Sequence, residues 1–272
     1  MRLKRDVEKS IIKTYRKKIW SKFVKAIKEY KLISEGDKIA VCVSGGKDSL
    51  LLAKCLEELE KHGQFKFSLE YILMDPGYNK ENLELIKNNC QQLGIKLNIF
   101  KSEIFDVINQ DDNESPCYVC ARMRRGHLYN KARELGCNKI ALGHHFNDVI
   151  ETILLNVLYA GQYKTMMPKL KSDHYEGMEL IRPLYYVKEE DIISWQKYND
   201  IKCLDCGCKI TIRKDGGKRK ELKALIKDLK KINPDVDISI LRSSENVNID
   251  QVISHQKDKK TLHFLDNYSS KK

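Results

Sequence analysis

The sequence predicts an α/β fold built on a doubly wound, parallel sheet with helices on both faces. Short β-branched runs such as residues 38–43 alternate with segments in which apolar residues recur at helical spacing. Glycine or proline punctuates these segments, and 42% of the 272 residues are hydrophobic, enough for one large core or two modest ones. Strands that alternate with helices in this way form parallel βαβ units with right-handed crossovers.

The first 160 residues supply the strands and helices of this sheet. The later helices end at or near Gly94, Gly136 and Gly161, as expected for the residue that follows a helix. A polar stretch at about 109–116 is expected to be a loop. We expect strands at 38–43, 68–74, 96–100 and 139–142, and helices at 49–62, 81–93, 119–135 and 148–159.

The pattern loosens beyond Gly161. We expect a strand near 180–186, helices near 188–198 and 218–232, and a cysteine-rich turn between those helices. No internal repeat is visible. This organisation divides the chain into a basic amphipathic helix at 1–35, an α/β domain at 36–186, a helical extension with the cysteine-rich turn at 187–254, and a polar, mobile tail at 255–272.

The chain is basic, with a formal net charge of +12 and a sequence pI of about 9.1. Residues 1–34 alone hold twelve Lys or Arg residues, among them Lys17 and Lys18, against three acidic residues. The spacing predicts one apolar helix stripe beneath a cationic face, formed by Ile12, Tyr15, Ile19, Phe23, Ala26, Ile27 and Tyr30. A surface helix docked on the core, a polyanion-binding helix and a membrane-surface helix all fit this pattern. A second basic run, 213–231, favours a polyanion.

Composition excludes several classes of protein. No run of about 18 apolar residues exists, so we expect no transmembrane helix and no membrane partner. The basic N-terminus lacks the apolar core and small residues of a secretory signal. Nine cysteines without such a signal indicate reduced thiols, metal ligands or redox chemistry rather than a disulfide framework. We therefore expect a cytoplasmic protein.

The sharpest motif joins the first strand to its helix and reads Ser44-Gly45-Gly46-Lys47-Asp48-Ser49. Backbone N–H groups and the helix N-terminus attract anions there, and the two glycines let the backbone wrap round phosphate oxygens. The serine hydroxyls and the Lys47 ammonium add donors, whereas Asp48 indicates a bound Mg²⁺ or a role in loop geometry. The spacing is not that of the mononucleotide-binding G-x-x-x-x-G-K-[ST] motif. A plain glycine turn with a capping serine is the alternative.

Two groups of cysteines have the spacing of metal ligands, Cys117-x-x-Cys120 and Cys203-x-x-Cys206-x-Cys208. A C-x-x-C turn lets two thiolates converge on one metal, and two such pairs make a site. Structural zinc and an iron–sulfur cluster both accept this ligand set, and spacing does not separate them. The remaining cysteines are predicted to be small buried hydrophobic residues: Cys42, Cys55, Cys90 and Cys137.

Further polar residues flank these motifs. Three arginines follow the first cysteine pair, namely Arg122, Arg124 and Arg125. Three roles fit them: stabilising the charge of the thiolates, contacting RNA phosphate, or keeping the helix surface solvated. Gly143 and His144 end a parallel strand on the edge where open α/β sheets bind ligands, although a structural histidine also fits. Asp75 ends the second strand, where it either caps the following loop or faces a ligand.

The 44–49 motif after a Val-Cys-Val strand resembles the PP-loop of N-type ATP pyrophosphatases. These enzymes cleave ATP between the α and β phosphates and adenylate an acceptor oxygen. The resemblance implies that ATP binds the loop residues Ser44, Gly45, Gly46, Lys47, Asp48 and Ser49. By itself it leaves the acceptor open.

A longer set of motifs resembles the tRNA 2-thiocytidine synthetase family. It comprises S-P-C-Y-V-C-A-R-M-R-R-G at 115–126, K-I-A-L-G-H-H at 139–145, M-P-K at 167–169 and C-x-x-C-G at 203–207. The resemblance runs from about residue 35 to about residue 247. It implies a [4Fe-4S] cluster held by only three cysteines, Cys117, Cys120 and Cys206, with Cys203 a less secure alternative. Cys208 departs from the family pattern, and a fourth thiolate there would close the open iron.

The same resemblance assigns roles around ATP. It implies that Gly143 and His144 face the nucleotide, that the adenosine lies near the ends of the first two strands, by Asp75, and that Asp148 holds Mg²⁺ or positions the activated group. The family usually has two successive acidic residues at this point, whereas this chain has Asn147 before Asp148.

The implied reaction is tRNA thiolation. ATP with Mg²⁺ adenylates the C2 oxygen of cytidine 32, Lys47 and the loop amides stabilise the leaving pyrophosphate, and sulfur carried by the cluster then replaces the oxygen. A cysteine desulfurase or free sulfide is the expected donor and a homodimer the plausible assembly. The expected RNA contacts are Arg122, Arg124, Arg125, Lys17 and Lys18. Thiolation of another nucleoside such as uridine 54, a zinc-stabilised adenylating enzyme with a different acceptor, and a non-catalytic RNA-binding protein are the alternatives.

Overall fold

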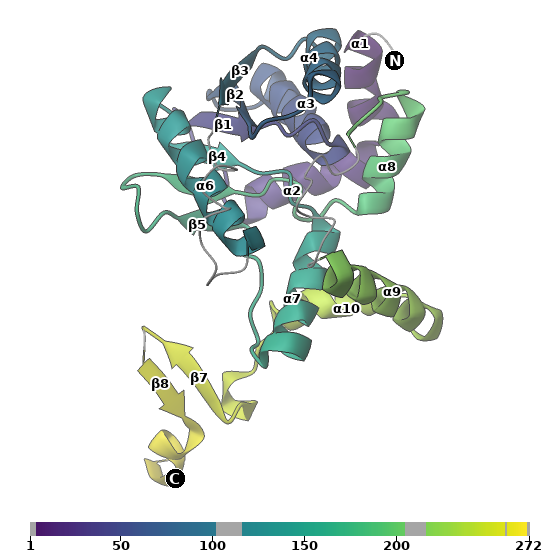
Figure 1. Cartoon of the computed structure of the whole chain (residues 1–272). Coiled ribbons are helices and arrows are strands. Elements are labelled where there is room, and N and C mark those ends of the chain that lie inside the picture. The colour runs from purple at the N-terminus through teal and green to yellow at the C-terminus, as the bar shows by residue number, and fades with distance from the viewer. Residues whose placement is uncertain (1–3, 102–115, 205–215, 259, 271–272) are drawn as a thin grey trace.

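The protein is built round a six-stranded sheet, seen in a computed structural model that describes residues 4–101, 116–204, 216–258 and 260–270 (Figure 1). The strand order is β3-β2-β1-β4-β6-β5, and every pair is parallel except β5 with β6. The predicted fold class is therefore confirmed. The strands are β1 (Lys38–Cys42), β2 (Ser68–Asp75), β3 (Leu97–Lys101), β4 (Lys139–Ala141), β5 (Lys169–Lys171) and β6 (Glu179–Ile181).

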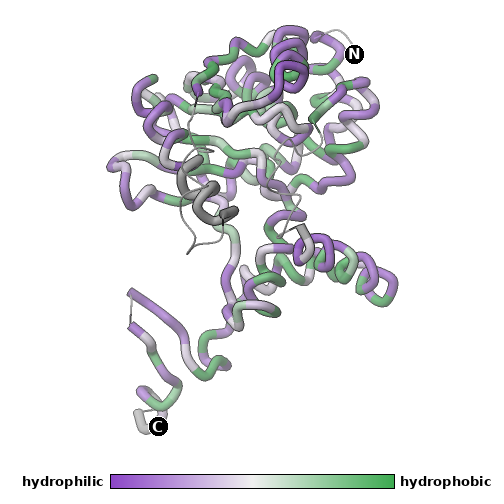
Figure 2. The backbone as a smooth tube through the Cα atoms, in the orientation of Figure 1, coloured by the Kyte–Doolittle hydropathy of each residue, from purple (hydrophilic) through white to green (hydrophobic). Residues whose placement is uncertain are grey.

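Helices cover both faces of the sheet and divide the interior into two cores. Ile39 and Val41 of β1 point into the larger core, whereas Ala40 between them points into the smaller one, as strand alternation requires. The smaller core lies beneath α6 (Pro116–Glu134). The larger core is covered by the N-terminal segment and by α3 (Lys47–His62), α4 (Lys80–Leu93), α7 (Phe146–Ala160) and α8 (Glu189–Tyr198). These helices alternate hydrophilic and hydrophobic residues (Figure 2).

The N-terminal segment is helical but not a regular α-helix. It comprises α1 (Lys4–Lys9), two π-helical stretches (Ser10–Thr14 and Arg16–Trp20) and α2 (Ser21–Glu29). Its buried residues recur every four positions, at Val7, Ile11, Tyr15, Ile19 and Phe23. Four residues of an α-helix turn about 40° beyond one full turn, so side chains that recur every four positions move gradually away from one face of the helix. The wider π turns correct that drift.

The expected apolar stripe is confirmed. Ile12 is half-buried and packs against the larger core, and Ile11 beside it is fully buried. The apolar stripe packs into the larger core, which contradicts the membrane-surface interpretation. Lys17 and Lys18 remain exposed on the opposite face. Among the described residues, no helix has both the length and the apolarity needed to cross a bilayer.

Buried polar contacts hold the N-terminal segment against the sheet domain. The fully buried Lys54 of α3 donates to Glu8 Oε1 at 2.9 Å and to the carbonyl of Leu93 at 3.0 Å. Trp195 Nε1 and Asn199 Nδ2 both donate to Ser10 Oγ at 3.1 Å. These contacts tie the segment to α3 and α8, and Lys54 also joins α3 to α4.

The remaining elements depart from prediction mainly in the second half. The strand expected at 180–186 stops at Ile181, because Pro183 lacks the N–H that a ladder needs. The edge strand β5 and the helix α10 (Val236–Ser243) were not predicted, whereas the basic helix is present as α9 (Gly216–Ile232). The tail expected to be mobile contains a hairpin of β7 (Ser254–Lys257) and β8 (Lys260–His263), followed by a 3₁₀ segment (Phe264–Ser270).

Candidate active site

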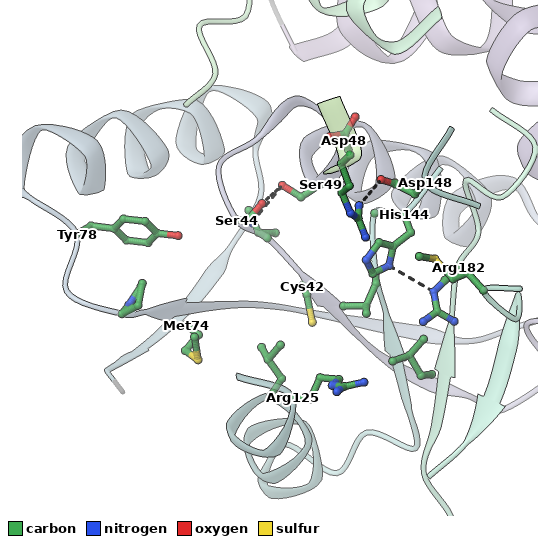
Figure 3. Close-up of a pocket in the computed structure, with 18 residues that line it drawn as sticks. Cys42, Ser44, Asp48, Ser49, Met74, Tyr78, Arg125, His144, Asp148 and Arg182 are labelled. Atoms are coloured by element: carbon green, nitrogen blue, oxygen red, sulfur yellow. Dashed lines mark hydrogen bonds and ion pairs between the residues drawn. The ribbon is translucent and has the colours of Figure 1, made fainter. Parts of the chain in front are cut away.

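A cavity of about 710 Å³ opens at the carboxyl edge of the parallel strands (Figure 3). The chain runs outward from β1 to β2 and β3 on one side and from β4 to β6 on the other, so β1 and β4 flank the point where strand order reverses. Ligands of open α/β sheets bind at such a point. The lining includes Cys42, Ser44, Asp48, Ser49, Met74, Tyr78, Arg125, Gly143, His144, Asp148, Arg182 and Arg219.

The glycine-rich loop between β1 and α3 is closed by its own serines. The N–H of Ser44 donates to Ser49 Oγ at 3.1 Å, and Ser49 Oγ donates to the carbonyl of Gly46 at 2.9 Å. Gly45 has a φ of +79°, and a Cβ there would lie 2.4 Å from Ile86 Cγ1 of α4. Only glycine satisfies both the backbone conformation and the close approach.

The loop after β4 packs directly on the first turn of α3. A Cβ at Gly143 would lie 3.1 Å from the backbone carbon of Asp48 and the nitrogen of Ser49. Asp148 Oδ2 accepts from the His145 N–H at 2.9 Å and so caps the start of α7. The N-termini of α3 and α7, with their partial positive charge, thus meet at one cavity, which suits a polyanion.

Asp48 supplies an unsatisfied carboxylate oxygen beside these helix ends. Its Oδ1 is buried, has no hydrogen-bond partner among the described residues and lies 3.8 Å from His145 Nε2. Burial raises the pKa of Asp48 above its usual value. Mg²⁺ is commonly held by one or two carboxylates plus substrate phosphates, so this oxygen fits such an ion. No cluster of three or more His, Cys, Asp or Glu side chains suited to a metal occurs in the described ranges.

Lys47 lies beside the cavity rather than in its lining. Its ammonium is 3.3 Å from Asp48 Oδ2 and 3.2 Å from Glu189 Oε1, at the start of α8. Although burial disfavours the charged form, these carboxylates hold the pKa of Lys47 above its usual value. Glu189 Oε2 also accepts from Lys223 of α9 at 2.9 Å.

Other predicted nucleotide ligands also lie outside the cavity lining, namely Gly45, Gly46 and Asp75. Asp75 Oδ1 accepts the N–H groups of Gly77 and Tyr78 at 2.9 and 2.8 Å, which is the geometry of a loop cap rather than of a ligand contact. Met74 at the end of β2, with Pro76 and Tyr78 of the loop that follows, lines the cavity.

Sequence reasoning missed four charged residues at the site. Arg182 follows β6 and Arg219 lies in α9, where its Nη1 is 3.6 Å from Asp148 Oδ1. Glu151 and Glu189 complete the charged network, and Glu151 Oε1 is 3.9 Å from Lys223 Nζ. A lone arginine in the apolar run 180–186 was the available signal for Arg182.

The predicted cysteine site falls largely on undescribed residues. Cys117 and Cys120 lie in the first turns of α6, but their side chains, like those of Arg122 and Arg124, are outside the described part, as are Cys206 and Cys208. Cys203 is half-buried against the larger core, and the N–H of the next residue, Leu204, donates to the carbonyl of Gly45 at 3.3 Å. The second cysteine group thus begins beside the glycine-rich loop.

The other four cysteines are mostly buried. Cys55, Cys90 and Cys137 are within the cores, and burial raises the pKa of Cys137 to about 11. Cys42 differs from the expectation of a plain core residue, because it lines the cavity at the end of β1.

The chain is similar to known proteins over most of its length. Residues 15–205 match the PP-loop domain family. The tRNA-cytidine(32) 2-sulfurtransferase of Geotalea uraniireducens is 41% identical over 226 residues, which cover 82% of this chain and 88% of the relative. The enzyme of that name from Geobacter sulfurreducens is 38% identical over 233 residues, covering 85% and 90%.

A solved structure shares the fold. The U34-tRNA thiolase of Methanococcus maripaludis, solved with its [4Fe-4S] cluster, superposes with a TM-score of 0.66 at 24% identity, over 83% of this chain and 76% of that chain. The family match covers the sheet, the glycine-rich loop and the cavity lining apart from Arg219, and the relatives span most of the chain. The chain therefore belongs to the PP-loop domain family and, within it, to the tRNA-cytidine(32) 2-sulfurtransferases.

Proposed function

We propose that this protein is an ATP-dependent tRNA sulfurtransferase that converts cytidine 32 of tRNA to 2-thiocytidine. One observation carries the proposal: the chain is about 40% identical, over 82% of its length, to relatives of that name. The cavity supports it, since the serines of the glycine-rich loop, two helix N-termini and the unbonded oxygen of Asp48 suit ATP with a divalent cation.

ATP would lie across the point between β1 and β4 where the strand order reverses. The adenosine would contact Met74 and Tyr78 at the end of β2, and the polyphosphate would lie on the loop at the start of α3. Asp48 would hold the Mg²⁺ through its unbonded oxygen, and Lys47, 3.3 Å from the other oxygen, would orient that carboxylate. To stabilise the leaving pyrophosphate, the role that we expected for it, Lys47 would first have to break its ion pair with Glu189.

The acceptor base would enter from the β4 and β6 side. The C2 oxygen of the pyrimidine would attack the α phosphorus, and pyrophosphate would leave onto the loop amides, which stabilise its charge. Asp148, paired with Arg219 and bonded to the start of α7, would position the activated group. A nucleotide of a loop is a cheaper target than a paired one, because less stacking is lost when the base turns out.

The sulfur would be carried by a [4Fe-4S] cluster on Cys117, Cys120 and Cys206, with Cys203 and Cys208 as the other thiols of the second group. Cys117 and Cys120 are three residues apart at the start of α6, a spacing that suits one metal centre. The same helix contributes Arg125 to the cavity, and Leu204, two residues before Cys206, bonds to Gly45. The cluster would supply a thiophilic iron for sulfur at the sulfide level, so protein thiols would not need to be oxidised. The donor would be a cysteine desulfurase or free sulfide.

The tRNA would be held by the basic segments. Lys17 and Lys18 are exposed on the N-terminal segment, and α9 brings further cations next to the cavity. The chain would comprise a basic N-terminal helix at 1–35, the α/β domain at 36–186, a helical extension at 187–254 and a polar tail at 255–272, and it would assemble as a homodimer.

Nucleoside analysis tests the function. Deleting the gene should remove 2-thiocytidine from total tRNA measured by mass spectrometry, and the wild-type gene should restore it. Asp48→Asn should fail to restore it, whereas Asp173→Asn, an exposed control of equal charge change, should succeed. Unchanged 2-thiocytidine in the deletion strain would refute the proposal, and loss of a different thionucleoside would favour the other tRNA acceptor.

Anaerobic purification tests the cluster separately. We expect a brown protein with visible charge-transfer absorption that loses its colour in Cys120→Ala. A colourless protein with one zinc per chain would contradict the sulfur-carrying role and favour the zinc-stabilised alternative.

A further inference from the structure

Arg182 is a buried cation that has no carboxylate partner among the residues that the structure describes. Its side chain lines the cavity, yet the residue is only 8% exposed. Its Nε donates to His144 Nδ1 at 3.4 Å, and Nη1 donates to the carbonyl of Met167. In the described part of the chain, no carboxylate oxygen lies within 4.0 Å of this guanidinium. Burying a charge costs free energy unless an opposite charge compensates it, so this position favours the binding of an anion.

The surroundings of Arg182 strengthen this imbalance. Arg125 from α6 lines the same cavity (Figure 3). Arg219 from α9 also belongs to its lining. Asp148 is the acidic residue that acts on Arg182 from a distance, but its Oδ1 is already 3.6 Å from Arg219. Burial lowers the pKa of Arg182 to about 10, so the guanidinium remains charged at neutral pH.

His144 turns this corner of the cavity into a donor-only surface. Because Arg182 donates to Nδ1, a neutral His144 carries its proton on Nε2. Burial lowers the pKa of His144 to about 4, so the neutral form prevails at physiological pH. The remaining N–H groups of Arg182 and the Nε2–H of His144 can bind only acceptors, and the net positive charge selects an anionic one.

The position of the pair separates it from the loop amides. His144 follows β4 and Arg182 follows β6, on the opposite side of β1 from the Met74 and Tyr78 that suit adenosine. We propose that Arg182 and His144 form a second subsite for a phosphoester oxyanion, distinct from the amides of the glycine-rich loop. The oxyanion belongs either to the α-phosphoryl group of the nucleotide or to the phosphodiester next to the acceptor nucleoside. The subsite deepens the proposed function and rests on its substrates, a nucleotide and an RNA.

Three probes test the subsite by equilibrium binding. They are inorganic pyrophosphate, AMP and a 17-nucleotide anticodon stem-loop RNA. In Arg182→Gln we expect pyrophosphate affinity to stay within about twofold of wild type, and the affinity for AMP or for RNA to fall roughly ten- to hundredfold, as for the loss of a charge-assisted hydrogen bond. Arg182→Lys keeps the charge and should recover part of the loss. Arg133→Gln, an exposed arginine of α6, is the matched control.

The pattern of loss identifies the ligand. A fall in AMP affinity assigns the subsite to the α-phosphoryl group, and a fall in RNA affinity alone assigns it to the phosphodiester. Equal loss for all three probes, pyrophosphate included, or no loss in a folded Arg182→Gln variant overturns the subsite. If Arg182→Gln does not fold, His144→Ala, which removes the other donor of the subsite, decides by the same criteria. None of these binding measurements requires sulfur transfer. A result against the subsite would therefore not contradict the nucleoside analysis, and a result against 2-thiocytidine formation would not contradict the binding data.

Discussion

The ammonium of Lys47 lies 3.2 Å from Glu189 Oε1, although the two residues are 142 positions apart in the chain. Glu189 Oε2 accepts from Lys223 at 2.9 Å, so one carboxylate joins the glycine-rich loop to the basic helix α9. The N–H of Glu189 donates to Asn147 Oδ1 at 2.9 Å, which ties the start of α8 to the start of α7. The neutral Asn147 makes this bond without adding a charge beside Asp148.

Replacing Glu189 should release Lys47. In Glu189→Gln we expect ATP to bind several-fold more tightly, because Lys47 loses a competing carboxylate and the charge beside the cavity rises by one. The free energy of unfolding should fall by about 1 kcal/mol, since the pairs are partly exposed. Titration calorimetry and urea unfolding measure both, with the exposed Glu190→Gln as control. Weaker ATP binding would mean that Glu189 instead directs Lys47 toward phosphate.

Gly45 should tolerate no side chain. Gly45→Ala adds strain at a φ of +79° and a clash with Ile86, so we expect it to lower the free energy of unfolding by about 2–4 kcal/mol. Gly36→Ala is the matched control, because Gly36 has a φ of +80° but nothing within 4 Å of an added Cβ. It should cost only the backbone strain, about 1 kcal/mol. Equal losses in urea unfolding would contradict the close packing of the loop on α4.

Glu151 should make stability depend on pH. Burial raises its pKa from 4.5 to about 7, so between these values the folded state binds more protons than the unfolded one. The free energy of unfolding therefore falls as pH rises from about 4.5 to 7. Glu151→Gln should be more stable than wild type at pH 8, by on the order of 1–2 kcal/mol, and nearly equal to it at pH 4. Denaturation at both pH values checks this against the exposed Glu176→Gln; identical profiles for the two variants would count against it.

Lys17 and Lys18 should contribute to RNA binding through charge alone. The double variant Lys17→Gln/Lys18→Gln should bind tRNA more weakly, and the slope of log affinity against log salt should shrink by roughly 0.7–0.9 for each phosphate that is no longer neutralised. Filter binding at several salt concentrations measures the slope. Lys96→Gln/Lys101→Gln removes the same charge from exposed positions near β3 and should leave the slope unchanged. A slope equal to wild type in the first variant would exclude that face from RNA binding.

Local patterns predicted the first half of the fold well. The strands up to β4 and the helices that follow them lie within about three residues of expectation, because strand and helix periodicity and glycine caps act over a few neighbouring residues. Two departures have local causes. Two π-helical stretches interrupt the helix expected at the N-terminus, and Pro183 ends the strand expected at 180–186 at Ile181.

The sequence by itself determined the motifs at the strand ends. Ser44 and His144 could be chosen because they follow strands whose carboxyl ends face the ligand side, Asp48 because it lies in the glycine-rich motif, and Asp148 through the family resemblance. Their partners were decided only by the tertiary structure. Ion pairing and desolvation depend on groups that the fold brings together from distant segments, as with Lys47 and Glu189, and no local pattern records them. For the same reason the sequence shows Arg182 only as one arginine in an apolar run. Its proposed role in binding an oxyanion follows from its burial in the folded chain, where no described carboxylate pairs with it.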